Sequence, residues 1–493
     1  MQKKINLILI LFLLPVTLFA QHRGDNLAFQ GFPVNNNVGV KAIALGGAYT
    51  SQTGDVSSLF YNPAGLANIN NLQISIGANR SANSWRENQA YRPNRMFWTL
   101  AFYLEGLYTP DPANNGIWDY ELAQDSSYIV REPDLGLDPF SEEAADWQNK
   151  SNDFGLNNIA AAYPITVADH KIVVSAAYSR NVVKDFDRND TYLDPHIGYD
   201  EYSVVERVVT DTVRFSWSRF TRQRDGHVQN FSAGLAYDLN KKIKIGFSMN
   251  MMNGKTTDFQ SLNRVGYFDI AKDNRFRFSY DTLDISLDGE SKFKAVNFNF
   301  GLVLKLERLS VGLNVQSPYD ITREWNYSNF TVDSLGLHTS NSKGTDTFES
   351  PASFSFGASL SPVDQFTFLL DYQMTRFSLG KIAHQPEDAT IRKIPDQTEL
   401  RCGIEYRMLE YLSLLAGYRY RTETFVPDGA AIKDRGPAVT GYTLGASFVL
   451  WNFGRIDIAY NFQRLKYYDS YFSNTNYVYE SLNDVLVGYT IGF

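Results

Sequence analysis

Three polar residues with the spacing of calcium ligands are the first feature of this sequence that could do chemistry. Asp185, Asp187 and Asn189 match the first three ligands of a helix–loop–helix calcium site. That motif next requires a glycine and later a glutamate, whereas this chain has Asp190 and His196 at those positions. We therefore interpret the stretch as a solvated acidic loop.

Other residues with catalytic potential are dispersed along the chain. The histidines stand at His22, His170, His196, His227, His338 and His384, with no metal-ligand spacing. The sequence has no Gly-x-Ser-x-Gly elbow and no phosphate-binding loop. We predict no enzymatic activity, no metal and no cofactor, and the alternative is a barrel enzyme with dispersed catalytic residues.

A group of charged residues near the C-terminus could bind a ligand. Its members are Arg401, Glu405, Arg407, Arg419, Arg421, Arg455 and Asp457. Most are separated by even numbers of residues within a run, so each run places them on one face of a strand. On the inner face of a barrel they could bind an anionic head group. Mutual pairing among hydrated charges is the interpretation that we favour.

The elements that carry these charges show a two-residue hydrophobic period. In the run 398–407, Leu400, Cys402, Ile404 and Tyr406 lie on the face opposite to the charges. Similar runs occur at 72–80, 155–164, 171–180, 228–238, 243–252, 295–305, 308–316, 352–360, 365–373, 412–421, 440–450, 455–463 and 485–493. Each is about ten residues long, as a tilted transmembrane strand requires.

The connections between these runs alternate between short turns and long excursions, which is typical of outer-membrane barrels. Long excursions are expected near 181–227, 253–291, 317–351, 374–397, 422–439 and 464–482. The alternation predicts an all-β fold, a 14-stranded antiparallel transmembrane β-barrel. The run 72–80 is the preferred first strand, with 96–104 as the alternative, and the path of 81–154 stays open. An arginine at the lumen-facing Gly417 is expected to be milder than one at the lipid-facing Leu414.

The composition of the chain agrees with a location in the outer membrane. Residues 1–20 combine Lys3 and Lys4 with an apolar run, which predicts a secretory signal peptide. Its removal changes the formal net charge from −8 to −10, because two lysines and no acidic residues are lost, and this argues against nucleic acid as a partner. The chain has 34 Phe and 30 Tyr, residues that favour strands and membrane boundaries. The lone Cys402 excludes an internal disulfide.

The last run ends on Phe493 with apolar residues at every second position. This pattern resembles the terminal signal that the barrel-insertion machinery recognises. We therefore expect outer-membrane lipid and the insertion machinery to be partners.

Residues 21–71 lack this alternation. They contain Gly46, Gly47, Asp55 and the run Asn62-Pro63-Ala64-Gly65. Glycines permit tight turns and close backbone approach, and Pro63 fixes its own φ angle. We predict that 21–71 forms a hatch in the lumen of the barrel made by 72–493, and a periplasmic tail is the alternative.

The stretch from Leu45 to Leu66 resembles the N-terminal signature of the FadL-like family of outer-membrane transport proteins, whose Asn-Pro-Ala motif corresponds to Asn62, Pro63 and Ala64. The resemblance is close over about 30 residues. It implies import of hydrophobic molecules, with lateral release through a gap in the wall and a hatch that controls passage.

Two functions therefore compete. The first is outer-membrane transport of a hydrophobic or amphipathic small molecule, such as a fatty acid or an aromatic hydrocarbon. The second is a binding and shuttle component of a secretion system, like the PorV-type carrier of type IX secretion. A general porin is a weaker third reading, because a plugged lumen disfavours it.

Overall fold

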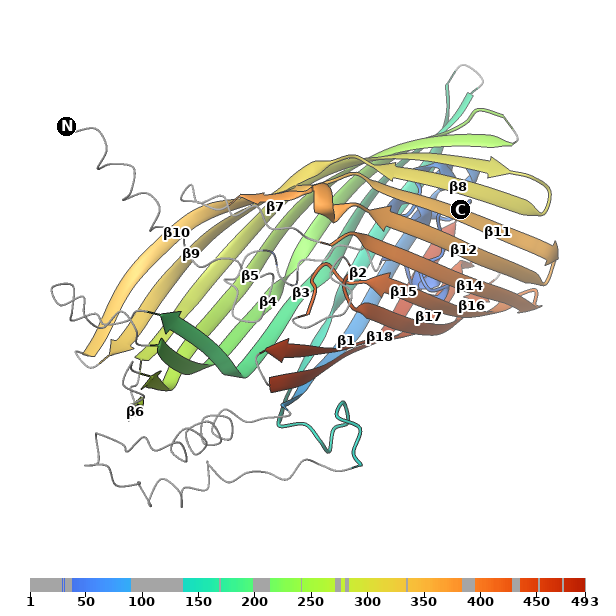
Figure 1. Ribbon diagram of the computed structural model, residues 1–493. Coiled ribbons are helices and arrows are strands. Elements are labelled where there is room, and N and C mark those ends of the chain that lie inside the picture. Colours follow the sequence, from blue (N-terminus) through green and yellow to red (C-terminus); the bar gives the residue numbers. More distant parts are fainter. Residues whose placement is uncertain are drawn as a thin grey trace, which may run out of the picture.

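The computed structural model describes residues 29, 31, 38–89, 136–167, 170–197, 213–240, 242–270, 276–279, 283–333, 336–383, 395–427, 435–450, 453–471 and 474–492. The signal peptide, the alternative first strand 96–104 and Phe493 lie outside these residues. The described residues form one antiparallel sheet that closes on itself (Figure 1). Closure occurs where β1 (Gln73–Gln89) pairs with both β2 (Trp147–Val167) and β18 (Asn474–Gly492).

The remaining strands follow in chain order around the barrel. They are β3 (His170–Ile197), β4 (Val213–Asp238), β5 (Ile243–Ile270), β6 (Phe276–Ser279), β7 (Leu283–Lys305), β8 (Leu309–Gln316), β9 (Tyr319–Asp333), β10 (Gly336–Ser350), β11 (Ser353–Val363), β12 (Phe366–Thr375), β13 (Lys381–Ala383), β14 (Gln397–Leu409), β15 (Leu412–Thr422), β16 (Ala438–Val449) and β17 (Arg455–Tyr471).

In four cases, two consecutive segments with separate labels form one barrel strand that is briefly interrupted. For example, β7 pairs with β8 through 299–305 and with β9 through 284–295, so β8 and β9 together span the wall. The same holds for β6 with β7, β10 with β11, and β12 with β13. The barrel therefore has 14 antiparallel strands, which confirms the predicted fold class.

The barrel is apolar outside and polar inside. Ile404 and Ile458 on the outer face are 44% and 43% exposed, whereas Arg401 and Asp457 on the inner face are buried. Exposed apolar side chains of this kind recur on the strands around the barrel. Contiguous apolar surface of this extent requires a non-aqueous surrounding. The outward apolar and inward polar faces agree with the alternation in the sequence.

The strands are much longer than the alternation predicts. β3 and β5 each have 28 residues, and they continue through stretches expected to be loops, as Figure 1 shows at the end near β6, β9 and β10. The interpretation of Asp185–Asn189 as a solvated loop is wrong, because this stretch lies in β3 and Asp185 binds Arg222. The hydrogen bonds between strands continue into stretches where both faces of the sheet are polar. Hydrophobic periodicity therefore marks only part of each strand.

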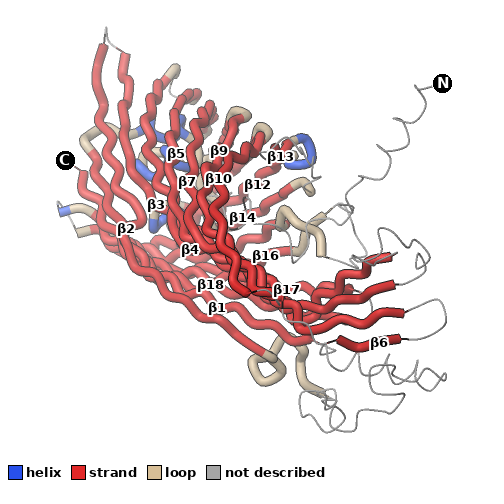
Figure 2. Tube along the Cα trace, turned by 90° about the vertical axis from the view of Figure 1, so that its left-hand side faces the viewer, coloured by secondary structure: helices blue, strands red, loops and turns tan. Residues whose placement is uncertain are grey.

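Short helices precede the barrel strands in the chain. They are α1 (Val40–Ala44), η1 (Val56–Phe60) and η2 (Pro63–Asn68). No helix in the described residues is long and apolar enough to cross a membrane. Seen after a 90° turn, these helices lie among the strands at the end of the molecule that carries the C-terminus (Figure 2).

Candidate functional site

Residues 38–69, which we name the interior segment, lie inside the barrel at the end with the short turns (Figure 1). Their apolar side chains form one core cluster with small inward residues of the wall, including Ala160, Ala236 and Ala459. Val38, Leu45 and Leu66 in this segment are fully buried. The segment therefore packs against the wall on several sides.

Ten inward-facing glycines of the wall make room for the interior segment. They are Gly77, Gly234, Gly246, Gly301, Gly312, Gly357, Gly403, Gly417, Gly445 and Gly488, and we name them the glycine collar. At each one, an added Cβ would meet atoms of the interior segment at close range. Eight of them form cross-strand partners: Gly77 with Gly488, Gly246 with Gly301, Gly312 with Gly357, and Gly403 with Gly417.

The Asn-Pro-Ala run sits against this collar. The side-chain Oδ1 of Asn62 accepts a hydrogen bond from the Ala64 N–H at 3.1 Å and caps η2. Its Nδ2 lies 2.8 Å from the Thr50 carbonyl, 3.2 Å from that of Leu302 and 3.3 Å from that of Leu313. Asn62 thus connects two parts of the interior segment to β7 and β8, and Pro63 at the first position of η2 needs no donor there.

The remaining glycines of the predicted hatch motif lie at close approaches. Gly46 and Gly47 have φ angles of +70° and +81°, which residues other than glycine rarely adopt. Gly46 also lies against the backbone of Cys402 and Tyr418, and a Cβ on Gly65 would overlap the carbonyl of Gln52.

Charged side chains tie the interior segment to the wall. Asp55 forms a 2.6 Å ion pair with Arg455, which also binds Asp457 at 2.9 Å. Burial alone would raise the pKa of the Asp55 carboxyl, but the Arg455 charge and the Ser57 N–H lower it from 3.8 to about 2. On another strand, Lys41 pairs with Glu405 at 3.0 Å.

Asp371 on β12 provides a further anchor that the sequence analysis missed. Its Oδ2 accepts hydrogen bonds from the backbone N–H groups of Tyr49 and Thr50, both at 2.8 Å. Asp371 is fully buried and faces Gly357 of the collar. No local motif marks it, because its partners are more than 300 residues away in the chain.

The other charges predicted to face the lumen differ in their surroundings. Arg401 and Arg419 both bind Glu399, at 2.5 and 3.0 Å, and Arg419 also donates to the Gly46 carbonyl. Arg421 pairs with Glu423 at 2.7 Å. Arg407 is exposed near the short turn after β14. These contacts favour the paired interpretation over a free head-group site.

Beyond the collar, the inner wall carries an apolar row. Neighbouring strands contribute Val183, Val228, Phe293, Ala295, Ile321 and Phe348, and Phe377 of the short helix η6 (Phe377–Leu379) joins them. The ring of Phe29 packs on this row, 6.3 Å from the Phe293 ring and 5.6 Å from the Phe348 ring. We name these wall residues the apolar row. It is the part of the described lumen that suits a hydrophobic ligand.

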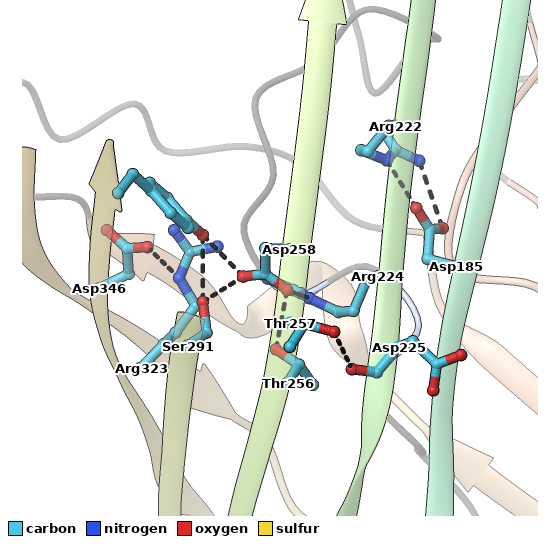
Figure 3. A network of polar contacts seen from close by, with 11 residues as sticks. Asp185, Arg222, Arg224, Asp225, Thr256, Thr257, Asp258, Ser291, Arg323 and Asp346 are labelled. Atoms are coloured by element: carbon cyan, nitrogen blue, oxygen red, sulfur yellow. Dashed lines mark hydrogen bonds and ion pairs between the residues drawn. The ribbon is translucent and has the colours of Figure 1, made fainter. Parts of the chain in front are cut away.

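A polar network lies further along the same strands (Figure 3). Arg224 and Asp258 form a fully buried ion pair at 2.8 Å, and Asp258 also accepts hydrogen bonds from Ser291 and Tyr327. The Arg224 guanidinium lies 5.2 Å above the Phe293 ring. Because these groups satisfy one another, we interpret the network as support for the long wall.

Among the described strands, the pairing between β2 and β3 is interrupted. The two strands pair only through 158–167 and 170–179. Farther from the short turn, residues 147–156 of β2 pair with β1 alone, and residues 180–189 and 192–197 of β3 pair with β4 alone. A register shift beside Gly77 and Ala78 marks the start of the separation.

Opposite faces of the two strands meet across this interruption. Trp147, Ser151 and Asp153 belong to the inward face of β2, since they share it with buried Ser81 and Glu87 of β1. They contact Phe186, Lys184 and Arg180, which belong to the outward face of β3 together with Tyr178. The edge of β1 and β2 therefore laps over the outside of β3, and we name this overlap the lapped seam.

The lapped seam was not predicted from the sequence, although one signal was present. Asn157 and Asn158 are adjacent polar residues that break the alternation between Leu156 and Ile159. Both asparagines are buried, and the register between β1 and β2 shifts there. A polar doublet inside an alternating run is consistent with a bulge.

Within the described residues, no group of three His, Cys, Asp or Glu side chains could hold a metal ion. Cys402 has a free thiol on an intermediate, partly exposed position.

Three comparisons place these features among known proteins. A family model described as "Outer membrane protein transport protein (OMPP1/FadL/TodX)" matches residues 211–483, more than half of the chain. No curated protein matches the sequence. A solved Pseudomonas aeruginosa FadL homologue has 12% identity and a TM-score of 0.56, with 93% of this chain and 98% of that chain covered. The Pseudomonas putida toluene transporter TodX has 14% identity and a TM-score of 0.55, covering 93% and 99%.

Proposed function

Since the chain belongs to the outer-membrane transport protein family (OMPP1/FadL/TodX), we propose that it carries hydrophobic or amphipathic small molecules and releases them sideways through its wall. The protein resides in the bacterial outer membrane, and it is a transport protein by family. The ligand class and the route within this chain are our proposals.

The apolar row supports the ligand class. A barrel that encloses water needs no apolar side chains on its inner face, yet Phe293 and Phe348 lie there together. An aromatic side chain, Phe29, occupies the row. A fatty acyl chain or a small aromatic ring could make the same contacts.

The interior segment argues against an axial route. It contacts the collar on both sides of the barrel, and it is held by Asp371, Arg455 and Glu405. A ligand that passed along the axis would have to displace this whole assembly. We therefore assign to the interior segment the role of a hatch that directs the ligand away from the axis.

The lapped seam is the single observation that carries the proposal. A ligand leaving between β2 and β3 above Asn158 would break no backbone hydrogen bond between these strands, because the ladder ends there. Val183 of the apolar row lies on β3 itself, so the row reaches the seam. Phe154, 77% exposed, lies on the outer face of β2 at this level and extends the apolar outer surface to the seam.

The proposal is tested by closing the seam. In a Cys402→Ser background, Ser151→Cys and Lys184→Cys are bridged with a short thiol cross-linker that a reductant cleaves. We expect bridging to reduce uptake of a labelled fatty acid or toluene to background, and reduction to restore it. A matched pair, Ile159→Cys and Tyr178→Cys, lies where the ladder is closed, and its bridging should leave uptake unchanged.

Unchanged uptake in the bridged seam variant would exclude lateral release at this place. A parent protein that takes up no hydrophobic probe would contradict transport of this class. Nothing in the described residues points specifically to the protein-carrier alternative, and only that second outcome would bring it forward.

A further inference from the structure

We propose that the ion pair between Asp153 and Arg180 is a latch that holds the lapped seam closed, so that its opening controls lateral release. The inference rests on the proposed function for its physiological meaning. The latch itself is a structural property that can be measured without transport.

The pair has the geometry of a specific contact. Arg180 Nη1 lies 2.9 Å from Asp153 Oδ2, and Nη2 lies 3.1 Å from Oδ1. Such a two-point contact fixes the relative position of its partners better than a single hydrogen bond does. The two side chains are 19% and 21% exposed, so water only partly screens them.

The pair also stands at the right place. Ser179, one residue before Arg180, is the last residue of β3 paired with β2. Asp153 lies across the seam on the inward face of β2. Among the described residues of the seam, the latch is therefore the ion pair nearest to the point where the backbone ladder ends.

Gly155 makes the latch possible. A Cβ at this position would lie 2.5 Å from Arg180 Nη1. The guanidinium crosses from the outward face of β3 to Asp153 through the space that a side chain at residue 155 would fill. A glycine with an ordinary φ angle in mid-strand weakens a strand, so close approach by Arg180 gives it a purpose here.

The remaining seam contacts are less constraining. Lys184 donates to the Ser151 hydroxyl at 2.9 Å, but it also lies 3.2 Å from Asp225 on β4. Farther along, the rings of Trp147 and Phe186 meet at 5.0 Å. Between these contacts lies a small cavity of about 30 Å³, lined by side chains that include Asn149.

Loss of the latch should therefore let the seam open more often. The probe is a cysteine at the cavity, Asn149→Cys in the Cys402→Ser background, labelled with a maleimide. We expect Arg180→Ala to raise the labelling rate about fivefold, the factor that corresponds to about 1 kcal/mol for a partly exposed pair. The exchanged pair, Asp153→Arg with Arg180→Asp, should bring the rate back toward that of the parent.

A matched control removes an ion pair that does not cross the seam. Lys294 and Glu324 pair at 3.0 Å between β7 and β9, so Lys294→Ala should not change labelling. If Arg180→Ala fails to fold, as judged by heat-modifiable migration, Asp153→Asn replaces it. Equal labelling in the parent and the folded latch variants would overturn the proposal, and so would equal increases in the single variants and the exchanged pair.

Uptake is measured in the same variants. Faster uptake of the labelled fatty acid in Arg180→Ala would support control of release by the latch. If labelling rises but uptake stays at the parent's measurable rate, the latch does not control release and the proposal fails in that respect. If the parent itself takes up no probe, the proposed function fails, while the labelling result still decides whether the latch holds the seam.

Discussion

Asp55 shows how a single residue can bind the interior segment to the wall. Its carboxylate lies between the Arg455 guanidinium and the Ser57 N–H, and it is 6% exposed. A pKa lowered from 3.8 to about 2 means that the docked state favours the charged form. A displacement of this size corresponds to on the order of 2 kcal/mol of docking stability.

This linkage predicts a pH dependence. A lowered pKa in the docked state gives stability that is present above about pH 4 and is lost as the pH falls toward about 2. We expect the protection factors of residues 38–69 against hydrogen exchange, corrected for the intrinsic exchange rate at each pH, to decrease as the pH falls over this range in detergent. Asp55→Asn should already exchange faster at pH 7 and should lack this component of the pH dependence. A parent and a variant with the same pH profile would contradict the role of this carboxylate.

Residue types near one another in the sequence allowed some of these contacts to be predicted. The role of Asn62 is of this kind, since a capping asparagine before proline is a local pattern. Asp371 and Arg180 could not be found in this way. Their partners lie on other strands or in the interior segment, so only the strand register brings them together.

At the level of elements, the collar and the interior segment depend on one another. The wall strands have glycines where the interior segment approaches them. The interior segment in turn has Gly46 and Gly47 where it turns beside β14 and β15. The expectation that an arginine at Gly417 would be milder than one at Leu414 did not take the interior segment into account. Even a Cβ there would overlap the backbone of Gly46.

This dependence predicts a difference between neighbouring residues of β15. Gly417→Leu should displace the interior segment while the barrel still folds, because strand pairing does not involve the side chain. Ala416→Leu places the same side chain on the lipid side and should have little effect. Limited proteolysis of residues 38–69 reports displacement, and heat-modifiable migration reports folding. Equal protection in both variants would show that the collar does not hold the segment.

The strand order, the number of strands and their two faces could be predicted because apolar alternation is strong where lipid lies outside. The outer parts of β3 to β10 could not, because there hydrogen bonding continues between polar faces. The seam was hidden for a further reason. Residues 147–156 and 180–189 retain strand character with only one partner strand each, and the sequence of a strand does not state how many neighbours it has.

Considered as a whole, the molecule closes its lumen in two different ways. At the end with short turns, the interior segment fills the lumen, and each described strand of the wall is hydrogen-bonded to both of its neighbours. Farther along, the lumen wall is held at the lapped seam by side chains. The first closure needs the interior segment, and the second does not, so the two can be separated by experiment.

Deletion of residues 38–69 should therefore leave a folded barrel with an open axis. The closing pairs of β1 with β2 and β18 do not involve the deleted residues. The wall groups that lose partners, Asp371, Glu405 and Arg455, would become hydrated, which avoids the cost of buried unpaired charges. In planar bilayers we expect a large steady ionic conductance from the deletion variant and little from the parent.

The path of this conductance can be identified with the bridged seam. If ions pass along the axis, the deletion variant that also carries bridged Ser151→Cys and Lys184→Cys should conduct as well as the unbridged one. A conductance that disappears on bridging would place the ion path at the seam and contradict the assignment of the interior segment as the axial barrier. A folded deletion variant with the parent's low conductance would do the same, since another part of the chain would then close the lumen.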